Sequence, residues 1–373
     1  MRSLRVLCTI GTRPEAIKMA PVVRALRLAP WAYPRVLATA QHRNLLDQML
    51  QVFGIEPDVD LDIMRPDQPL PSLTARLLEA LDTALEAESP DIVLAQGDTT
   101  TVLATALACF YRRIAFGHVE AGLRTWNSNN PYPEEMNRAL VARLARWHFA
   151  PTASARENLL REGVPPDAVT VTGNTVIDAL FDVAERHDSP PVHLDPSKRL
   201  ILVTAHRREN FGPPLEELCR ALRAVVDRNL DVEVLYPVHP NPHVHGPVHR
   251  ALANTARITL CEPLDYVSFV RAMKRCFLIL SDSGGVQEEA PALAKPVLVL
   301  RTETERPEAV AAGVVRLVGT DFSTITGEVQ RLLDDPFAYQ AMARGVSPYG
   351  DGNAAARIVG VLASATRVDR VPA

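Results

Sequence analysis

The chain has 373 residues, more than the roughly 250 to 300 at which one hydrophobic core stops growing, so two domains are expected. Hydrophobic residues make up 47% and charged residues 23%, with a formal net charge of -4. This balance predicts a globular protein and gives no long-range attraction to nucleic acid or an anionic membrane. The five cysteines are scattered and no apolar stretch is long enough to span a bilayer. We therefore expect a cytoplasmic protein with reduced thiols.

The first half of the chain alternates short apolar runs with stretches of helical periodicity, which is the pattern of repeated βαβ units. Near-continuous apolar runs such as IVLA are typical of strands that are covered on both faces, and they predict a parallel sheet. The expected strands are Leu4–Ile10, Arg35–Thr39, Val59–Ile63, Asp91–Gln96, Ile114–Val119, Trp147–Ala150 and Val169–Thr172.

A charged stretch with three prolines, His187 to Lys198, follows as a linker, and a second βαβ series begins after it. Its expected strands are Leu200–Thr204, Val232–Pro237, Ile258–Leu260, Phe277–Ser281, Val297–Leu300 and Val314–Val318. The predicted fold class is α/β, with two Rossmann-like doubly wound domains, 1–173 and 174–353, and an interdomain cleft. A C-terminal helix within 354–373 is a candidate to pack back on the first domain. Functional residues are expected in the loops after the strands.

Three loops of the first half carry cations or carboxylates toward the predicted crevice. GTRPEAIKMAP follows the first strand and opens a helix, so Arg13 points toward an anion and Lys18 lies about two turns further on. GDTTT and HVEAGLRT bring Asp98 and Glu120 to neighbouring strand ends. Two carboxylates beside cations predict acid or base chemistry at this edge.

A third carboxylate comes from NPYPEEMNR, where a helix starts after Pro133. Acidic residues favour helix N-termini in any case, and for Glu135 this structural explanation is the better one. We therefore take Glu134 as the site candidate of the pair.

The second half offers groups suited to a diphosphate. In LVTAHRRENFG, His206, Arg207 and Arg208 directly follow a strand. In SDSGGVQEEAP, the residues Ser283 to Gly285 let the backbone approach a phosphate closely.

Two further side chains extend this set. Glu289, one turn into the helix, suits ribose hydroxyls, and Arg306 in ERPEA either adds a cation or pairs with neighbouring glutamates.

Other ligands are disfavoured by the motifs. The chain has neither GxGxxG nor GxxxxGK[ST], so a nicotinamide dinucleotide and a P-loop nucleotide are not expected. The histidines at 239, 243, 245 and 249 are interrupted by prolines that should break helical register, so no metal site is expected there. His239 alone, at a strand end, remains a candidate ligand contact.

Seven motifs in order, GTRPEAIKMAP, GDTTT, HVEAGLRT, PEEMNR, TAHRREN, SDSGGVQEEAP and ERPEA, resemble the non-hydrolysing UDP-N-acetylglucosamine 2-epimerases over essentially the whole chain. The resemblance implies two domains of the glycosyltransferase-B type with the active site between them, a homodimer, and no cofactor. It also implies UDP-N-acetylglucosamine as a small-molecule substrate.

Position by position, the resemblance assigns the site residues. The implied catalytic residues are Asp98, Glu120, Glu134 and His206. The implied substrate contacts are Arg13, Lys18, Arg207, His239, Phe269, Ser283, Gly284, Gly285, Glu289 and Arg306. Gln41 and His42 match a loop that in some members holds a second, activating substrate molecule. The chain departs from the family pattern at Trp126, where a small residue is usual.

Epimerisation at carbon 2 needs both the cations and the carboxylates. The proton on carbon 2 of the sugar becomes acidic only as UDP leaves carbon 1, so cations on the diphosphate and carboxylates beside the ring are expected. Elimination would give 2-acetamidoglucal, and re-addition of UDP would follow proton return to the other face. The alternatives are C2 epimerisation of a modified UDP-sugar such as UDP-2,3-diacetamido-glucuronate, a glycosyltransferase of the same architecture, and a non-catalytic UDP-sugar-binding sensor.

Overall fold

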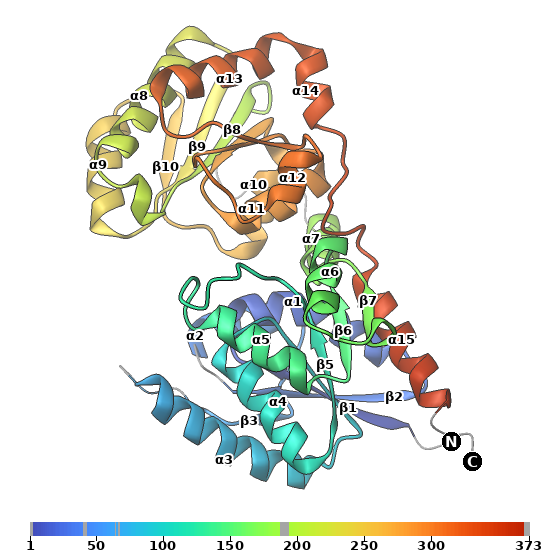
Figure 1. The fold of residues 1–373 in the computed structure, drawn as a ribbon. Coiled ribbons are helices and arrows are strands. Elements are labelled where there is room, and N and C mark those ends of the chain that lie inside the picture. Colours follow the sequence, from blue (N-terminus) through green and yellow to red (C-terminus); the bar gives the residue numbers. More distant parts are fainter. Residues whose placement is uncertain (1–2, 40–42, 64, 66–67, 187–193, 369–373) are drawn as a thin grey trace. The chain divides into compact units, whose positions relative to one another are not determined.

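The computed structural model describes residues 3–39, 43–63, 65, 68–186 and 194–368 and contains two parallel sheets, each with helices on both faces (Figure 1). The chain divides into two compact units, Met1–Ala179 with Tyr349–Ala373, and Leu180–Pro348. The first boundary between these units falls inside helix α7, after residue 179.

The first unit holds a seven-stranded sheet of order β3-β2-β1-β4-β5-β6-β7. Its strands are β1 Leu4–Ile10, β2 Ala32–Ala38, β3 Val59–Asp60, β4 Ile92–Gln96, β5 Ala115–Val119, β6 Trp147–Ala150 and β7 Val169–Val171. Its helices are α1 Arg13–Arg27, α2 Arg43–Val52, α3 Leu70–Glu88, α4 Thr100–Arg112, α5 Glu134–Leu144, α6 Ala153–Arg161, the start of α7 Thr175–Arg186, and α15 Ala354–Val368. A short 3₁₀ helix, Pro166–Ala168, precedes β7.

The second unit holds a six-stranded sheet of order β10-β9-β8-β11-β12-β13. Its strands are β8 Arg199–Thr204, β9 Val232–Pro237, β10 Ile258–Cys261, β11 Leu278–Ser281, β12 Val297–Val299 and β13 Val315–Leu317. Its helices are α8 Pro213–Arg228, α9 Pro242–Leu252, α10 Tyr266–Arg275, α11 Gly284–Glu289, α12 Pro307–Ala311, α13 Phe322–Asp334 and α14 Pro336–Met342.

Both sheets have the Rossmann strand order, so the α/β fold class predicted from the sequence is confirmed. In each sheet the order reverses beside the first strand, between β1 and β4 and between β8 and β11. Ligands of open α/β sheets bind outside the carboxyl ends of the strands at this reversal.

Most predicted strand ends agree with the structure within one residue, but two predictions in the first sheet were wrong. Strand β2 begins at Ala32 and not at Arg35, because it pairs with β1 along its whole length. Strand β3 ends at Asp60 and not at Ile63, because only Val59 and Asp60 pair with β2.

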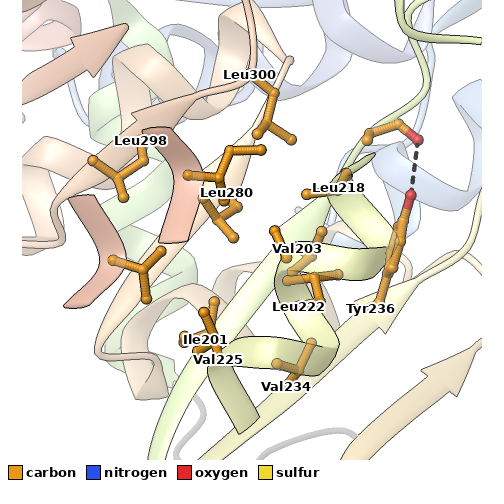
Figure 2. Packing of buried hydrophobic residues seen from close by; sticks show 14 of the residues in the cluster. Ile201, Val203, Leu218, Leu222, Val225, Val234, Tyr236, Leu280, Leu298 and Leu300 are labelled. Atoms are coloured by element: carbon orange, nitrogen blue, oxygen red, sulfur yellow. Dashed lines mark hydrogen bonds between the residues drawn. The ribbon is translucent and has the colours of Figure 1, made fainter. Parts of the chain in front are cut away.

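The core of the second unit holds the loop after β8 in place. Tyr236 on β9 is fully buried among Val203 of β8 and Leu218 and Leu222 of α8 (Figure 2). Its hydroxyl donates a hydrogen bond to the carbonyl of Ala205 at 3.5 Å, so the end of β8 is attached to the core directly before His206 (Figure 2).

The last helix belongs to the first unit, where α15 lies beside α1. Asp178 on α7 accepts the first backbone N–H groups of α15, from Ala354 at 3.2 Å and Ala355 at 2.9 Å. This carboxylate caps the helix from outside its own segment. Within the described ranges, no helix is both long and apolar enough to cross a membrane.

Candidate active site

Glu120 is the centre of a buried cluster directly after β5. Its backbone is in the left-handed region, with φ of 64°, and the residue is 7% exposed. Lys18 on α1 donates to both carboxylate oxygens, at 2.6 and 2.7 Å. The side-chain amides of Asn174, at 2.9 Å, and of Gln96 donate to the same carboxylate. Four hydrogen bonds therefore fix the Glu120 carboxylate, and one of its partners is a cation.

Asp98 lies at the neighbouring strand end, after β4, and its carboxylate is 3.3 Å from Nε of Arg138 on α5. Burial raises the pKa of Asp98 to about 6, an effect that Arg138 and Lys18 oppose and that Glu120 and Glu134 increase. The side chain remains 31% exposed. A reachable carboxyl group with a pKa near neutrality is suited to accept and return a proton.

The two glutamates at the start of α5 have different surroundings. Glu134 is half-buried, and its negative charge helps to raise the pKa of Asp98. Glu135 is 5% exposed and accepts the backbone N–H groups of Thr125, at 3.0 Å, and Trp126, at 2.9 Å. Glu135 therefore holds the preceding loop, which is a structural role.

Trp126 itself is 53% exposed, with a left-handed φ of 62°, and Arg161 lies over its ring at 5.1 Å. The residue that departs from the family pattern thus sits on the surface of this loop.

Glu15 is a buried carboxyl group that the sequence did not single out. Its Oε2 accepts the backbone N–H groups of Gly11 and Thr12, and its Oε1 accepts the hydroxyl of Thr99 at 2.6 Å. Burial raises the pKa of Glu15 to about 7, against these three hydrogen bonds, and Asp98 raises it further. Glu15 joins the loop after β1 to the loop that carries Asp98.

The remaining predicted residues of the first unit lie at the edge of this cluster or outside the described part of the chain. Arg13 is exposed as the first residue of α1. Gln41 and His42, predicted for an activating ligand, lie outside the described residues.

In the second unit, Asp282 organises the loop that carries His206. Asp282 is completely buried after β11, and its Oδ2 accepts the backbone N–H groups of His206 and Arg207, both at 2.8 Å. The side-chain amide of Asn210 donates to the same oxygen at 3.0 Å. The other oxygen, Oδ1, is 3.2 Å from Nδ1 of His206. The carboxylate therefore binds both the backbone and the ring of His206.

The rings of His206 and His239 stack, with centroids 5.7 Å apart and planes inclined by 18°. Burial lowers the pKa of His206, Asp282 opposes this, and His239 and Arg207 lower it further. This lowered pKa favours the neutral ring at pH 7.

The predicted phosphate loop lies at the start of α11, next to Asp282. Ser283 precedes the helix as its N-cap residue, and its N–H donates to Oγ of Ser281 at 3.0 Å. A Cβ added at Gly284 would lie 3.9 Å from Nη2 of Arg306, and one at Gly285 would lie 3.5 Å from Oε1 of Glu289. Because Gly284 and Gly285 have no side chains, the backbone between the Arg306 cation and the Glu289 carboxylate is not covered.

Three further predicted contacts lie around α11. Arg306 forms an ion pair with Glu288 on this helix, so it both pairs with a glutamate and stays near Gly284. Glu289 accepts the hydroxyl of Tyr266 at 3.3 Å. Phe269 is half-buried on α10, the helix that begins at Tyr266.

The expectation that prolines break the helical register of the histidine-rich segment is wrong. Pro242 and Pro247 do not break the helical register, because Pro242 occupies the first turn, where its missing N–H has no helical partner, and α9 continues through Pro247. His245 and His249 consequently stack on one face at 4.2 Å. Among the described residues, no group of three histidine, cysteine, aspartate or glutamate side chains could hold a metal ion.

Two Rossmann-ordered units with polar groups gathered at both reversal points define a protein of the glycosyltransferase-B fold class. Sucrose-phosphate synthase from Thermosynechococcus elongatus shares this fold, with a TM-score of 0.64 at 13% identity over 98% of this chain and 100% of that one.

The chain belongs to the UDP-N-acetylglucosamine 2-epimerase family, whose model matches residues 24–363. The UDP-N-acetylglucosamine 2-epimerase of Salmonella typhimurium is 53% identical over 97% of this chain and 99% of its own length. The crystal structure of UDP-GlcNAc 2-epimerase from Neisseria meningitidis bound to UDP-GlcNAc has a TM-score of 0.86 and 45% identity, covering 97% of this chain and 100% of that one.

Several site residues were missed from the sequence although each had a detectable signal. Asp282 and Gln96 sit at the carboxyl ends of apolar strands, and Asn174 lies in the turn GNT. Arg138 follows Glu134 by four residues, the spacing that places two side chains on one helix face. Glu15 gave the weakest signal, because an acidic residue at a helix start is common.

Proposed function

We propose that this chain interconverts UDP-N-acetylglucosamine and UDP-N-acetylmannosamine by elimination of UDP and its re-addition. The observation that carries the proposal is Asp98, a partly accessible carboxyl group with a pKa of about 6 beside the fixed Glu120–Lys18 pair. Membership of the epimerase family supports the same substrate.

The reaction requires a proton to leave a carbon that is not acidic in the ground state. As the C1–O bond to UDP breaks, positive charge develops at carbon 1, and the adjacent C2–H bond becomes acidic. A base takes this proton, the C–H electrons form the C1=C2 bond of 2-acetamidoglucal, and UDP departs with the C1–O electron pair. The reverse steps on the other face give the epimer.

We assign the proton transfer to Asp98, because its raised pKa makes it a stronger base than an ordinary aspartate and leaves it ionised at pH 7. Glu120 is held by Lys18, Gln96 and Asn174, and is better suited to act as a fixed negative charge facing the positive ring. Glu134, half-buried beside them, is our candidate for proton return to the opposite face.

The groups of the second unit suit the leaving UDP. Arg207, Arg306 and the exposed backbone of Ser283 to Gly285 provide cations and N–H groups for a diphosphate. Glu289 on α11 is the proposed partner of the ribose hydroxyls, and His239 and Phe269 complete the proposed contacts.

We also propose a homodimer in the cytoplasm. Phe110 and Tyr111, at the end of α4, are 60% and 67% exposed and offer apolar surface that a second copy would cover. The five cysteines are all free, and burial raises the pKa of Cys8, Cys109 and Cys276 to about 12, which fits unreactive thiols in a reducing compartment. Light scattering of the purified chain at several concentrations tests the dimer.

Incubation with UDP-N-acetylglucosamine, followed by NMR of the sugar anomeric signals, tests the activity. We expect conversion to the UDP-N-acetylmannosamine signals until a constant ratio is reached from either direction. Binding without conversion would identify a sensor, and a much higher kcat/KM with a 2,3-diacetamido substrate would identify an epimerase of a modified sugar. Either result would refute the proposed substrate or reaction.

A further inference from the structure

We infer that Asp282 is a positioning residue that holds the His206 imidazole with its proton on Nδ1, so that the Nε2 lone pair is presented to the substrate. Asp282 lies in the loop after β11 and His206 in the loop after β8, at the point where the strand order of the second sheet reverses. The pairing therefore joins the two loops that an α/β sheet of this order offers to a ligand.

The two carboxylate oxygens of Asp282 have separate tasks. Oδ2 accepts three hydrogen bonds, from the backbone N–H groups of His206 and Arg207 and from the side chain of Asn210. Oδ1 is buried and forms no standard hydrogen bond within the described part of the chain, while Nδ1 of His206 lies 3.2 Å away. Leaving a buried carboxylate oxygen unsatisfied is unfavourable, so an N–H on Nδ1 is the arrangement that satisfies it.

The other groups that face the His206 ring do not favour the opposite tautomer. His239, from the loop after β9, stacks on the ring, and its own Nδ1 accepts the N–H of Asn241 at 3.1 Å, so that this nitrogen carries no proton. Arg207, the next residue, is a cation and disfavours a second positive charge. Burial, His239 and Arg207 together lower the pKa of His206, and Asp282 is the carboxylate that opposes them.

The consequence for catalysis rests on the proposed function. With Nδ1 protonated, Nε2 takes up a proton from solvent to give an imidazolium whose charge the Asp282 carboxylate stabilises. That proton can be donated to the phosphate oxygen that departs with the C1–O electron pair, and it returns to solvent through Nε2 afterwards. Asp282 exchanges no proton with the substrate and acts only through His206.

Asp282→Asn is the variant that tests this role, because the amide oxygen can still accept the three bonds made to Oδ2. The NH₂ group then faces Nδ1 of His206 as a donor, which requires the proton to move to Nε2. In ¹⁵N NMR of the histidine-labelled chain, with His206 assigned from a His206→Gln sample, we expect the Nδ1–H tautomer in the parent protein and the Nε2–H tautomer in Asp282→Asn.

In the same variant we expect kcat to fall about 100-fold or more, the range of a lost acid or base, with a much smaller change in KM. Asp321→Asn, which removes a helix-capping carboxylate at the start of α13, is the matched control and should keep full activity. Melting temperatures of both variants separate unfolding from loss of catalysis.

Two results would overturn the inference: an Nε2–H tautomer of His206 in the parent protein, or a folded Asp282→Asn variant with unchanged kcat. The NMR measurement needs no substrate. If the parent protein does not epimerise UDP-N-acetylglucosamine, the proposed function fails, while the tautomer of His206 still decides the positioning role.

Discussion

At the scale of single residues, Asp98 and Glu120 lie on neighbouring strand ends but in different electrostatic surroundings. Glu120 is fixed by Lys18 and two amides, whereas Asp98 forms an ion pair with Arg138, whose Nε lies 3.3 Å from its carboxylate. This difference separates a fixed anion from a group that can exchange a proton.

The raised pKa of Asp98 predicts the acid side of the pH profile. As pH falls through about 6, the carboxylate takes up a proton and can no longer act as a base, so kcat/KM should fall below that pH. Arg138 lowers this pKa, so Arg138→Gln should move the decline to higher pH. Initial rates between pH 5 and pH 9 measure both profiles. A decline at unchanged pH in a folded variant would argue against Asp98 as the base.

The Lys18–Glu120 pair predicts a large loss of stability when only one partner is removed. Lys18→Met leaves the buried Glu120 carboxylate without its cation, and we expect a loss of about 3 kcal/mol in the free energy of unfolding. The double variant Lys18→Met, Glu120→Gln should recover most of this loss, because no uncompensated charge remains. Urea unfolding of the parent, the two single variants and the double variant checks the coupling, and simple additivity would contradict it.

The strand-end motifs predicted from the sequence place Asp98 and Glu120 at neighbouring strand ends of the first sheet, and His206 and Ser283 at the reversal point of the second. An apolar run followed by polar residues identifies such a strand end. The partners of these groups were harder to predict. Lys18 and Asn174 reach Glu120 from positions 102 and 54 residues away, and no local pattern encodes such a meeting.

At the scale of elements, Gly122 shows how closely α6 approaches the loop after β5. The residue has φ of 92°, and a Cβ there would lie 2.2 Å from the carbonyl oxygen of Ala155 on α6. Glycine is therefore needed both for the backbone conformation and for the contact, two residues after Glu120.

Gly122→Ala should destabilise the first unit by more than Gly163→Ala does. Gly163 follows α6 with φ of 82° and has nothing within 4 Å of an added Cβ, so its substitution carries only backbone strain, about 1 to 2 kcal/mol. For Gly122 the collision with backbone atoms adds to that strain. Thermal unfolding of both variants measures the difference, and equal losses would show that the contact relaxes freely.

Strand bounds were predicted well where the apolar run and the ladder coincide, as in β6 and β9. They failed in β2 because Pro34, which has no N–H to donate, argues against a strand through it, although Ala32 to Pro34 do pair with β1. They failed in β3 because the alternation of apolar and acidic residues in 59–63 continues past the two residues that pair. The start of β2 and the end of β3 depend on which residues pair with the neighbouring strand, and the sequence of a single segment does not specify this pairing.

At the scale of the whole molecule, both units contain a buried carboxylate with the same structural role. A buried carboxylate joins the loops at the reversal of strand order, Glu15 between the loops after β1 and β4, and Asp282 between the loops after β8 and β11. In each unit, this places a catalytic candidate, Asp98 or His206, next to a rigid anchor.

Because each unit has its own core, we expect two unfolding transitions in calorimetry, of which UDP raises the one that belongs to the second unit. Arg306→Ala should reduce this shift, since it removes a proposed phosphate contact. Asp98→Asn should leave the shift unchanged, because the proposed role of Asp98 is at the sugar ring. A lost UDP response in Asp98→Asn would show that its role is structural.

Incubation with UDP-N-acetylglucosamine in heavy water, with carbon 2 observed by NMR, tests the elimination mechanism most directly. Removal and return of the C2 proton predicts deuterium at carbon 2 in the manno product and in recovered substrate, and Asp98→Asn should abolish this exchange. A manno product that retains its original C2 proton would contradict the mechanism.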